Sequence, residues 1–138
     1  MPSNARRARV LMAVSARAAE RMCRILGGMD LERPGSLRDL VFALRRRSFD
    51  LVIVGCHFDG SQAIDAMNTA HRNAPRVPLA CVRVLPFDSA LGEATLSALH
   101  AAAEELGADC FIDVMQFPDD AQGNARVRDM LERLVYVT

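Results

Sequence analysis

The sequence contains no lysine, although it is 138 residues long and carries seventeen basic residues, all of them arginine. This absence excludes every function that needs a side-chain amine, such as a Schiff base, a lysine general base or an ammonium group that grips a phosphate. Pairing with carboxylates and phosphates is still available to the arginines, because the guanidinium group stays charged.

An excess of positive charge is also absent. The formal net charge is zero, and 51% hydrophobic and 25% charged residues are typical of an ordinary globular domain. Because affinity for nucleic acid comes mainly from phosphate neutralisation, this balance argues against a nucleic-acid partner. The triplet Arg45-Arg46-Arg47 is a local exception. No aromatic residue is interleaved with it, so we interpret it as the solvated end of a helix, where cations also suit the helix dipole.

Long apolar runs and paired cysteines are missing as well. No segment reaches the length of a membrane span, so we expect no contact with a membrane. The cysteines stand singly, without a CxxC pair, and each lies in or beside an apolar run, where cysteine behaves as a small hydrophobic residue. They are Cys23, Cys56, Cys81 and Cys110. The pattern favours a reducing compartment, and we expect a cytoplasmic protein.

Short apolar runs alternate with helical periodicity along the whole chain. The runs predict strands over residues 9–14, 29–32, 51–54, 79–84 and 110–115, of which 29–32 is the weakest and 51–54 the strongest. Helices are predicted over 16–26, after a cap at Ser36, and over about 61–72, 91–106 and 124–135. Strands that alternate with helices indicate parallel crossovers and an α/β three-layer sandwich. No linker or repeat is visible, so we expect one domain, 1–138.

The segments around the third and fifth predicted strands narrow the fold further. Asp50-Leu51-Val52-Ile53-Val54-Gly55 is followed by Phe58-Asp59-Gly60, and Pro78 precedes the fourth strand. Gly107-Ala108-Asp109 precedes the fifth strand, and the last helix runs through Arg126-Val127-Arg128 to Leu134. Over nearly its whole length the chain resembles response-regulator receiver domains. The resemblance implies a flavodoxin-like, five-stranded parallel sheet of strand order 2-1-3-4-5 and a role in bacterial two-component signalling.

The residues that carry the chemistry of that family are replaced here. The aspartate that accepts the phosphoryl group corresponds to Gly55, and the acidic pair that ends strand one corresponds to Val14 and Ser15. Arg83 occupies the place of a serine or threonine, and the end of strand five offers no lysine. The resemblance therefore implies a pseudo-receiver that is not an enzyme and works independently of phosphorylation.

A metal ion or other cofactor is not expected. Asp59 is an acid close to Gly55, which stands at the position of the acceptor aspartate. The only second carboxylate that the sequence places nearby is Asp88. Mg²⁺ sites need convergent carboxylates, so we interpret Asp59-Gly60 as turn chemistry instead.

Ligands of open parallel sheets bind beyond the carboxyl ends of the strands. That crevice is predicted to collect Ser15, Cys56, His57, Asp59, Arg83 and Asp88. Cys56 and His57 make a poor catalytic pair, because adjacent residues of an extended segment point to opposite faces; we expect Cys56 in the core and His57 in a loop. Two interpretations of Arg83 stay open. It binds an anion or locks the site by pairing with Asp59 or Asp88, or else it points to solvent.

The stretch between strand four and strand five is longer than is usual for receiver domains. In that family the surface of helix four, strand five and helix five is the common docking face, which corresponds here to about 91–134. We therefore expect a phosphorylation-independent interaction module that binds a protein partner or forms a homodimer. The alternative is a sensor of a small molecule or anion at the strand ends.

Overall fold

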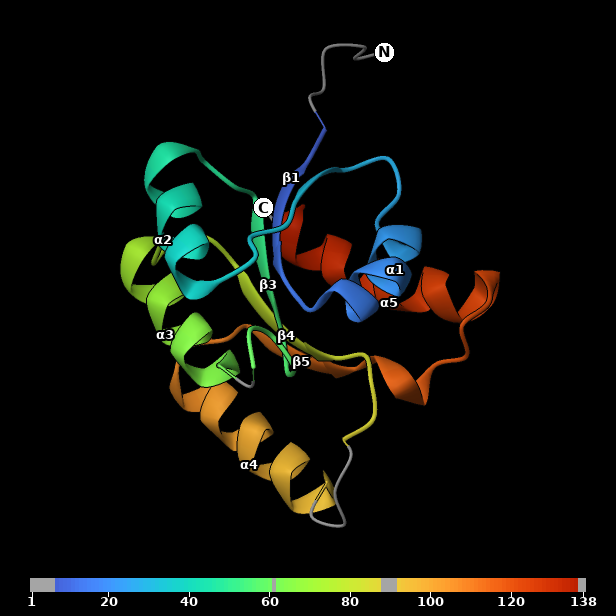
Figure 1. Cartoon of the computed structure of the whole chain (residues 1–138). Helices are drawn as coiled ribbons and strands as arrows, with labels where there is room; N and C mark the ends of the chain where they lie inside the picture. Colours follow the sequence, from blue (N-terminus) through green and yellow to red (C-terminus); the bar gives the residue numbers. More distant parts are fainter. Residues whose placement is uncertain (1–6, 61, 88–91, 137–138) are drawn as a thin grey trace.

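Five parallel strands form one sheet in the computed structural model, which describes residues 7–60, 62–87 and 92–136, with only the backbone of Glu93 (Figure 1). The strands are β1 (Arg9–Ala13), β2 (Asp30–Glu32), β3 (Leu51–Gly55), β4 (Leu79–Arg83) and β5 (Cys110–Asp113). They pair in the order β2-β1-β3-β4-β5. The predicted α/β fold, strand order 2-1-3-4-5, is confirmed. Asp88 lies outside the described residues.

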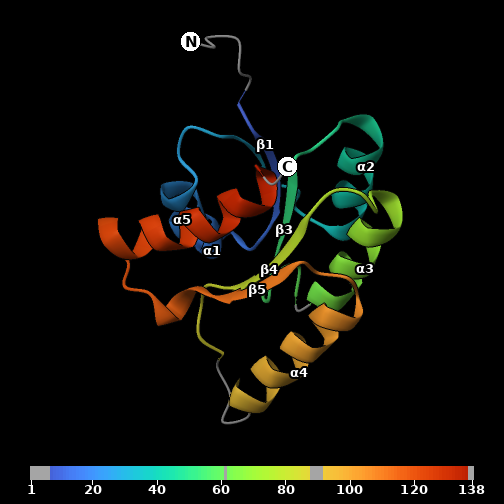
Figure 2. The same ribbon diagram turned by 180° about the vertical axis from the view of Figure 1, so that it is seen from behind.

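Helices cover both faces of the sheet, as the two opposite views show (Figures 1 and 2). On one face lie α1 (Ala16–Ile25) and α5 (Ala121–Val135), which pack against each other. On the other lie α2 (Leu37–Arg46), α3 (Ala63–Asn73) and α4 (Gly92–Glu105), with α3 between its two neighbours. Each face has its own apolar core, and alternate residues of the central strands feed the two cores.

The central strand β3 is buried at all five of its residues, from Leu51 to Gly55. It pairs with β1 on one side and with β4 on the other, so that Gly55 lies opposite Val82. A run of Leu, Val and Ile suits such a strand, because both of its faces pack against helices. None of the described helices is long and apolar enough to cross a membrane.

Short polar side chains set where the helices begin. The Ser36 hydroxyl accepts a hydrogen bond from the Asp39 amide at 3.1 Å, as the sequence predicted for this cap. The last helix was predicted to begin at residue 124, which is wrong by about one turn. It begins at Ala121, because the Asp120 carboxylate caps it by accepting from the Gly123 amide at 2.7 Å.

The fifth strand is shorter than predicted. It was expected over residues 110–115, but it ends at Asp113 and continues as a single 3₁₀ turn, η1 (Val114–Gln116). The turn keeps Val114 fully buried, and the Val114 carbonyl accepts a hydrogen bond from the Arg21 guanidinium at 3.1 Å. The buried guanidinium of Arg21 needs carbonyl partners, so it competes with the hydrogen-bond ladder of the sheet for the backbone of this segment.

Candidate functional site

The candidate site lies at the carboxyl ends of the strands, where β1, β3, β4 and β5 finish at one edge of the sheet. Ser15 follows β1, Gly55 ends β3 and Arg83 ends β4. In the parallel register Arg83 lies opposite Asp113, the last residue of β5. The topology therefore gathers four residues that are far apart in sequence.

Gly55 packs closely against Val14 in this arrangement. A Cβ atom built on Gly55 would lie 3.1 Å from Val14 Cγ1 and 3.3 Å from Val14 Cβ. The Val14 side chain is itself only 1% exposed and belongs to the core. A side chain at position 55 would therefore begin in tight contact with this branched apolar side chain, which would have to shift by a few tenths of an ångström.

The most strongly paired group at the edge is Arg83. Its Nε donates to Asp113 Oδ1 at 2.7 Å and its Nη2 donates to Asp113 Oδ2 at 2.8 Å. The Arg83 and Asp113 side chains are only 13% and 16% exposed. The hydrogen bonds from Arg83 hold the pKa of Asp113 below its ordinary value, against the opposing effect of desolvation. This bidentate pair is the strongest polar contact of the site.

The outcome for Arg83 differs from the sequence hypotheses. The guanidinium does not point freely to solvent, and among the described residues it pairs with the Asp113 carboxylate. The hypothesis of a pair with Asp88 falls outside the described residues. The sequence interpretation did not include Asp113 among the residues that it gathered at this edge. The signal was available: Arg83 and Asp113 both end parallel neighbouring strands, and in-register pairing sets them opposite each other.

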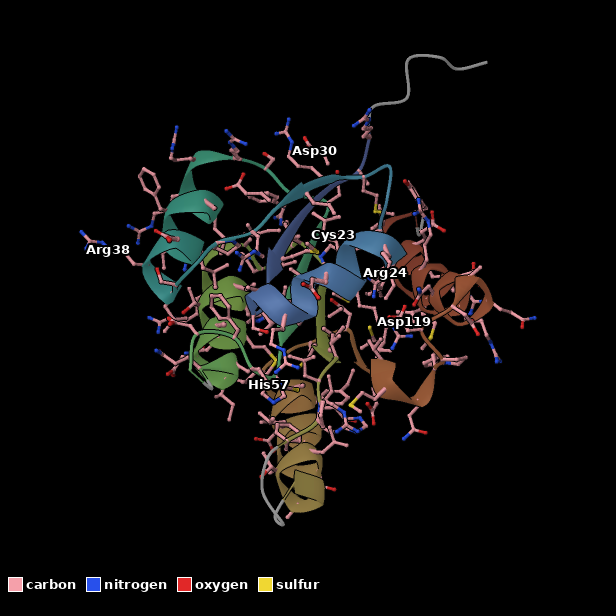
Figure 3. The ribbon with its side chains drawn as sticks, turned by 45° about the vertical axis from the view of Figure 1, so that its right-hand side comes forward. Cys23, Arg24, Asp30, Arg38, His57 and Asp119 are labelled. Atoms are coloured by element: carbon pink, nitrogen blue, oxygen red, sulfur yellow. The ribbon has the colours of Figure 1, made fainter. Side chains whose placement is uncertain are left out.

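Two aromatic contacts extend the site toward the segment after β4. The Arg83 Cζ atom lies 5.8 Å from the centroid of the Phe87 ring, and the His57 ring lies 4.9 Å from the same ring, tilted by 33°. His57 is half-buried and faces α4 from the loop after β3 (Figure 3). Phe87 thus contacts one residue that ends β4 and one residue of the loop after β3.

Asp59 serves a different part of the fold. Its backbone has φ 45°, a turn conformation that aspartate tolerates. One carboxylate oxygen accepts from the Leu37 amide at 3.2 Å and from Gln62 Nε2 at 3.5 Å. Asp59 therefore caps the first turn of α2 and joins it to the loop before α3. Ser15 likewise caps α1, where its hydroxyl accepts from the Ala18 amide at 3.3 Å.

Cys56 is buried, 4% exposed, and shares a hydrogen bond with the Cys81 thiol. That hydrogen bond lowers the pKa of Cys56, with a smaller contribution from the charge of Arg83, whereas burial opposes both. The same bond and burial raise the pKa of Cys81 far above its ordinary value. Cys23, which the sequence interpretation treated as a small core residue, is exposed.

The donor set does not fit the Mg²⁺ ion that working receivers hold. The Val14 side chain offers no ligand atom, Ser15 uses its hydroxyl as a helix cap, and Asp59 caps α2. Within the described ranges no three residues of the types His, Cys, Asp and Glu gather closely enough to hold a metal ion.

Sequence reasoning missed a buried arginine between α1 and α5. The Arg21 side chain donates to the carbonyls of Val114, Phe117 and Pro118 and to Asn124 Oδ1. Arg21 follows Ala18 and precedes Met22 and Ile25 on the buried face of α1. A lone charged residue on an otherwise apolar helix face was the available signal.

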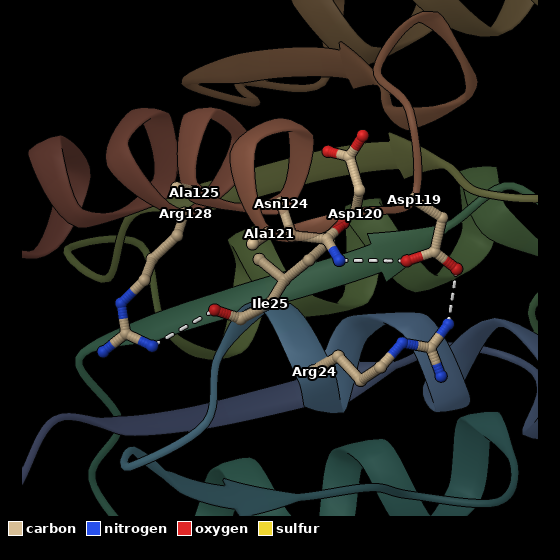
Figure 4. A pocket seen from close by; sticks show the side chains of 8 residues that line it. All are labelled: Arg24, Ile25, Asp119, Asp120, Ala121, Asn124, Ala125 and Arg128. Atoms are coloured by element: carbon tan, nitrogen blue, oxygen red, sulfur yellow. Dashed lines mark hydrogen bonds and ion pairs between the residues drawn. The ribbon is translucent and has the colours of Figure 1, made fainter.

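A polar hollow lies near Arg21, between α1 and α5 (Figure 4). Asp119 accepts hydrogen bonds from Arg24 and from Asn124, and Arg128 donates to the Ile25 carbonyl at 3.1 Å and the Gly27 carbonyl at 2.7 Å. These contacts satisfy the last carbonyls of α1. These polar groups are therefore partners of one another, and their contacts hold α1 and α5 together.

Solved structures that superimpose on this chain include response-regulator receiver domains. A response regulator of Thermotoga maritima superimposes with a TM-score of 0.69 at 15% identity, over 94% of this chain and 98% of that one. A CheY-like receiver domain protein of Methanospirillum hungatei gives 0.65 at 15% identity, over 94% of both chains. The phosphorylated cyanobacterial phytochrome response regulator RcpA gives 0.71 at 10% identity, over 96% and 97%. No family model and no curated protein matches the sequence. At these identities the likeness establishes the receiver fold.

Proposed function

We propose that this chain is a pseudo-receiver that works in bacterial cytoplasmic signalling as a protein-interaction module, without accepting a phosphoryl group. The observation that carries the proposal is the contact between Val14 and Gly55. Glycine at position 55 has no carboxylate to accept a phosphoryl group, and a Cβ there would lie in tight apolar contact with Val14 Cγ1, at 3.1 Å. No catalytic role is assigned to Cys56 or His57, which are packed against Cys81 and Phe87 respectively.

The remaining polar groups at the strand ends favour a single fixed arrangement. Asp113 neutralises Arg83 through two hydrogen bonds, and Phe87 lies between Arg83 and His57. A switch needs two arrangements that differ by only a few kcal/mol, and a ligand that favours one of them. The bidentate pair of Arg83 with Asp113 and the packing of Phe87 support one fixed arrangement of the strand ends over a second one. We infer that the docking surface is presented constitutively.

The docking surface that we propose is formed by α4, β5 and α5. As an edge strand, β5 is only partly covered: Phe111 is half-buried and stacks on His100 of α4, with ring centroids 4.7 Å apart. Of the α4 side chains that the structure describes, only Ala103 is buried. Met130 of α5 adds an apolar side chain that is 37% exposed. A partner protein or a second copy of the chain would cover these groups.

Sedimentation velocity over a range of protein concentrations tests this surface. For the unchanged protein we expect an increase in mass with concentration. The Met130→Glu variant should lose that increase, because a charge would be buried in the contact. Ile64→Glu is the matched control: Ile64 is 46% exposed on α3, outside the proposed surface. A protein that stays monomeric at every concentration excludes the homodimer and leaves only a different protein as partner.

The alternative function, an anion sensor, would use the same edge. It is supported by the buried guanidinium of Arg83, but Asp113 already occupies both donors that face it. Phosphate or sulfate would have to displace a carboxylate that is held in place. A rise in melting temperature with either anion, abolished in Arg83→Met, would favour the sensor over the interaction module.

A further inference from the structure

The outer face of α2 carries an aromatic side chain that nothing in the described chain covers. The buried residues of this helix are Leu40, Ala43 and Leu44, whereas Phe42 is 59% exposed. A surface helix ordinarily places polar residues on its outer face. Single exposed apolar residues are common, so Phe42 gains meaning only from its surroundings.

Hollows lie on the surface beside Phe42. One, of about 550 Å³, is lined by Val41 and Phe42 together with Arg38, Asp39 and Arg45. Another, of about 250 Å³, is also lined by Phe42, with three arginines and the two acids Glu32 and Asp39 among its other residues. Because both include Phe42, the ring borders an apolar depression on one side and a more polar one on the other. This is a shaped surface and not an isolated ring.

Arginines outnumber acids around the Phe42 ring. Residues 33–47 contain five arginines and one acid, although the whole chain is neutral. In the part of the chain that the structure describes, no carboxylate lies within ion-pair distance of Arg38 or Arg45. Figure 3 shows Arg38 extending from α2 away from the body of the molecule. Arg46 places its guanidinium 4.8 Å from the centre of the Phe42 ring.

We propose that this α2 surface (Arg38, Val41, Phe42, Arg45 and Arg46) binds an acidic peptide segment of a partner protein that also carries an apolar side chain. Guanidinium groups suit carboxylates because their donors form a fork that matches the two oxygens. The apolar side chain of the segment enters the depression beside Phe42. Charge complementarity requires a partner segment with negative charge, and the apolar depression excludes a partner that is recognised by charge alone.

This surface is separate from the one proposed above. The helix α3 lies between α2 and α4, and α5 covers the opposite face of the sheet. A nucleic acid is less well matched, since base stacking along a strand needs successive aromatic side chains and only Phe42 is present here. The chain would thus have two independent docking surfaces.

Fluorescence anisotropy with labelled synthetic peptides tests the proposal. The probes are a glutamate–leucine peptide, the same peptide with serine for leucine, and the same peptide with lysine for glutamate. We expect saturable binding of the first peptide alone, weakened about tenfold or more in the double variant Arg38→Gln/Arg45→Gln and by added salt. Phe42→Ala should remove the preference for leucine over serine, because the apolar contact is lost.

The control variant is Arg126→Gln/Arg133→Gln, which removes the same charge from exposed positions of α5. Its affinity for the glutamate–leucine peptide should equal that of the unchanged protein. The proposal is overturned if this peptide does not bind, if the lysine peptide binds as well, or if the α5 variant loses as much affinity as the α2 variant. It is also overturned if α2-dependent binding is seen only with duplex DNA or with vesicles that contain phosphatidylserine.

Discussion

Arg83 and Asp113 face each other at the ends of two neighbouring strands and form a bidentate pair, with Nε–Oδ1 2.7 Å and Nη2–Oδ2 2.8 Å. Both side chains are more than four-fifths buried. The pair joins the carboxyl ends of β4 and β5, and Phe87 packs on the guanidinium. The strength of this pair therefore bears directly on whether the strand ends can change their arrangement.

Breaking the pair from either side should destabilise the fold. For Asp113→Asn or Arg83→Met we expect a loss of about 1–3 kcal/mol in the free energy of unfolding, because the remaining partner stays partly buried without its counter-charge. The double variant should lose less than the sum of the two. Urea denaturation measures all three. The control is Arg47→Met, whose pair with Glu32 is exposed and should contribute at most about 1 kcal/mol.

The same pair should make stability depend on pH in the acid range. The pKa of Asp113 is lowered in the folded protein, so the unfolded chain binds the proton more tightly. The stabilisation is therefore complete above the ordinary aspartate pKa of about 3.9 and is lost as the pH falls through the lower folded value. The urea midpoint of the unchanged protein should fall more steeply below that pH than the midpoint of Asp113→Asn. Parallel curves would contradict the assignment.

Adding a side chain at Gly55 should be costly. In Gly55→Ala the new Cβ would meet Val14 Cγ1 at 3.1 Å, and we expect a loss of about 1–3 kcal/mol from overpacking. The penalty should shrink in a Val14→Ala background, because the clashing methyl group is gone. Gly27→Ala is the control, since its Cβ would meet only backbone oxygens at 3.7 Å or more. Equal effects of the two alanines would show that Val14 does not fill the position.

The hydrogen bond between Cys56 and Cys81 should be visible in thiol chemistry. The pKa of Cys56 is lowered chiefly by this bond, so Cys81→Ala should raise it. In a Cys23→Ser background, which removes the exposed thiol, the pH profile of Cys56 alkylation should then move to higher pH. Arg83→Met should move it in the same direction by a smaller amount. A profile that does not move in Cys81→Ala would contradict the assigned hydrogen bond.

The sheet was predictable because its signals are local. The run from Leu51 to Val54 is apolar and mostly β-branched, and it forms the buried centre of the sheet. Ser36 precedes a helical pattern and caps it, as predicted. Strand order and layers then follow from the alternation of elements and from the resemblance to receivers.

The site was less predictable because its contacts join residues far apart in sequence. Arg83 and Asp113 are thirty positions apart, and only the exact register of β4 and β5 brings them together. Asp59 was interpreted as turn chemistry, and its backbone fits that, but its bond to the Leu37 amide depends on how α2 packs. Arg21 donates hydrogen bonds to the carbonyls of the segment after β5, and the sequence does not reveal the path of that segment.

The central claim is that the strand ends are closed to phosphoryl transfer. It is tested most directly by incubating the protein with acetyl phosphate and Mg²⁺, followed by intact mass spectrometry and amide NMR spectra. The account predicts an unchanged mass and no change in the resonances of α4, β5 and α5. A covalent phosphoryl group on Asp59 or another acid of this edge, together with shifts across those elements, would contradict it.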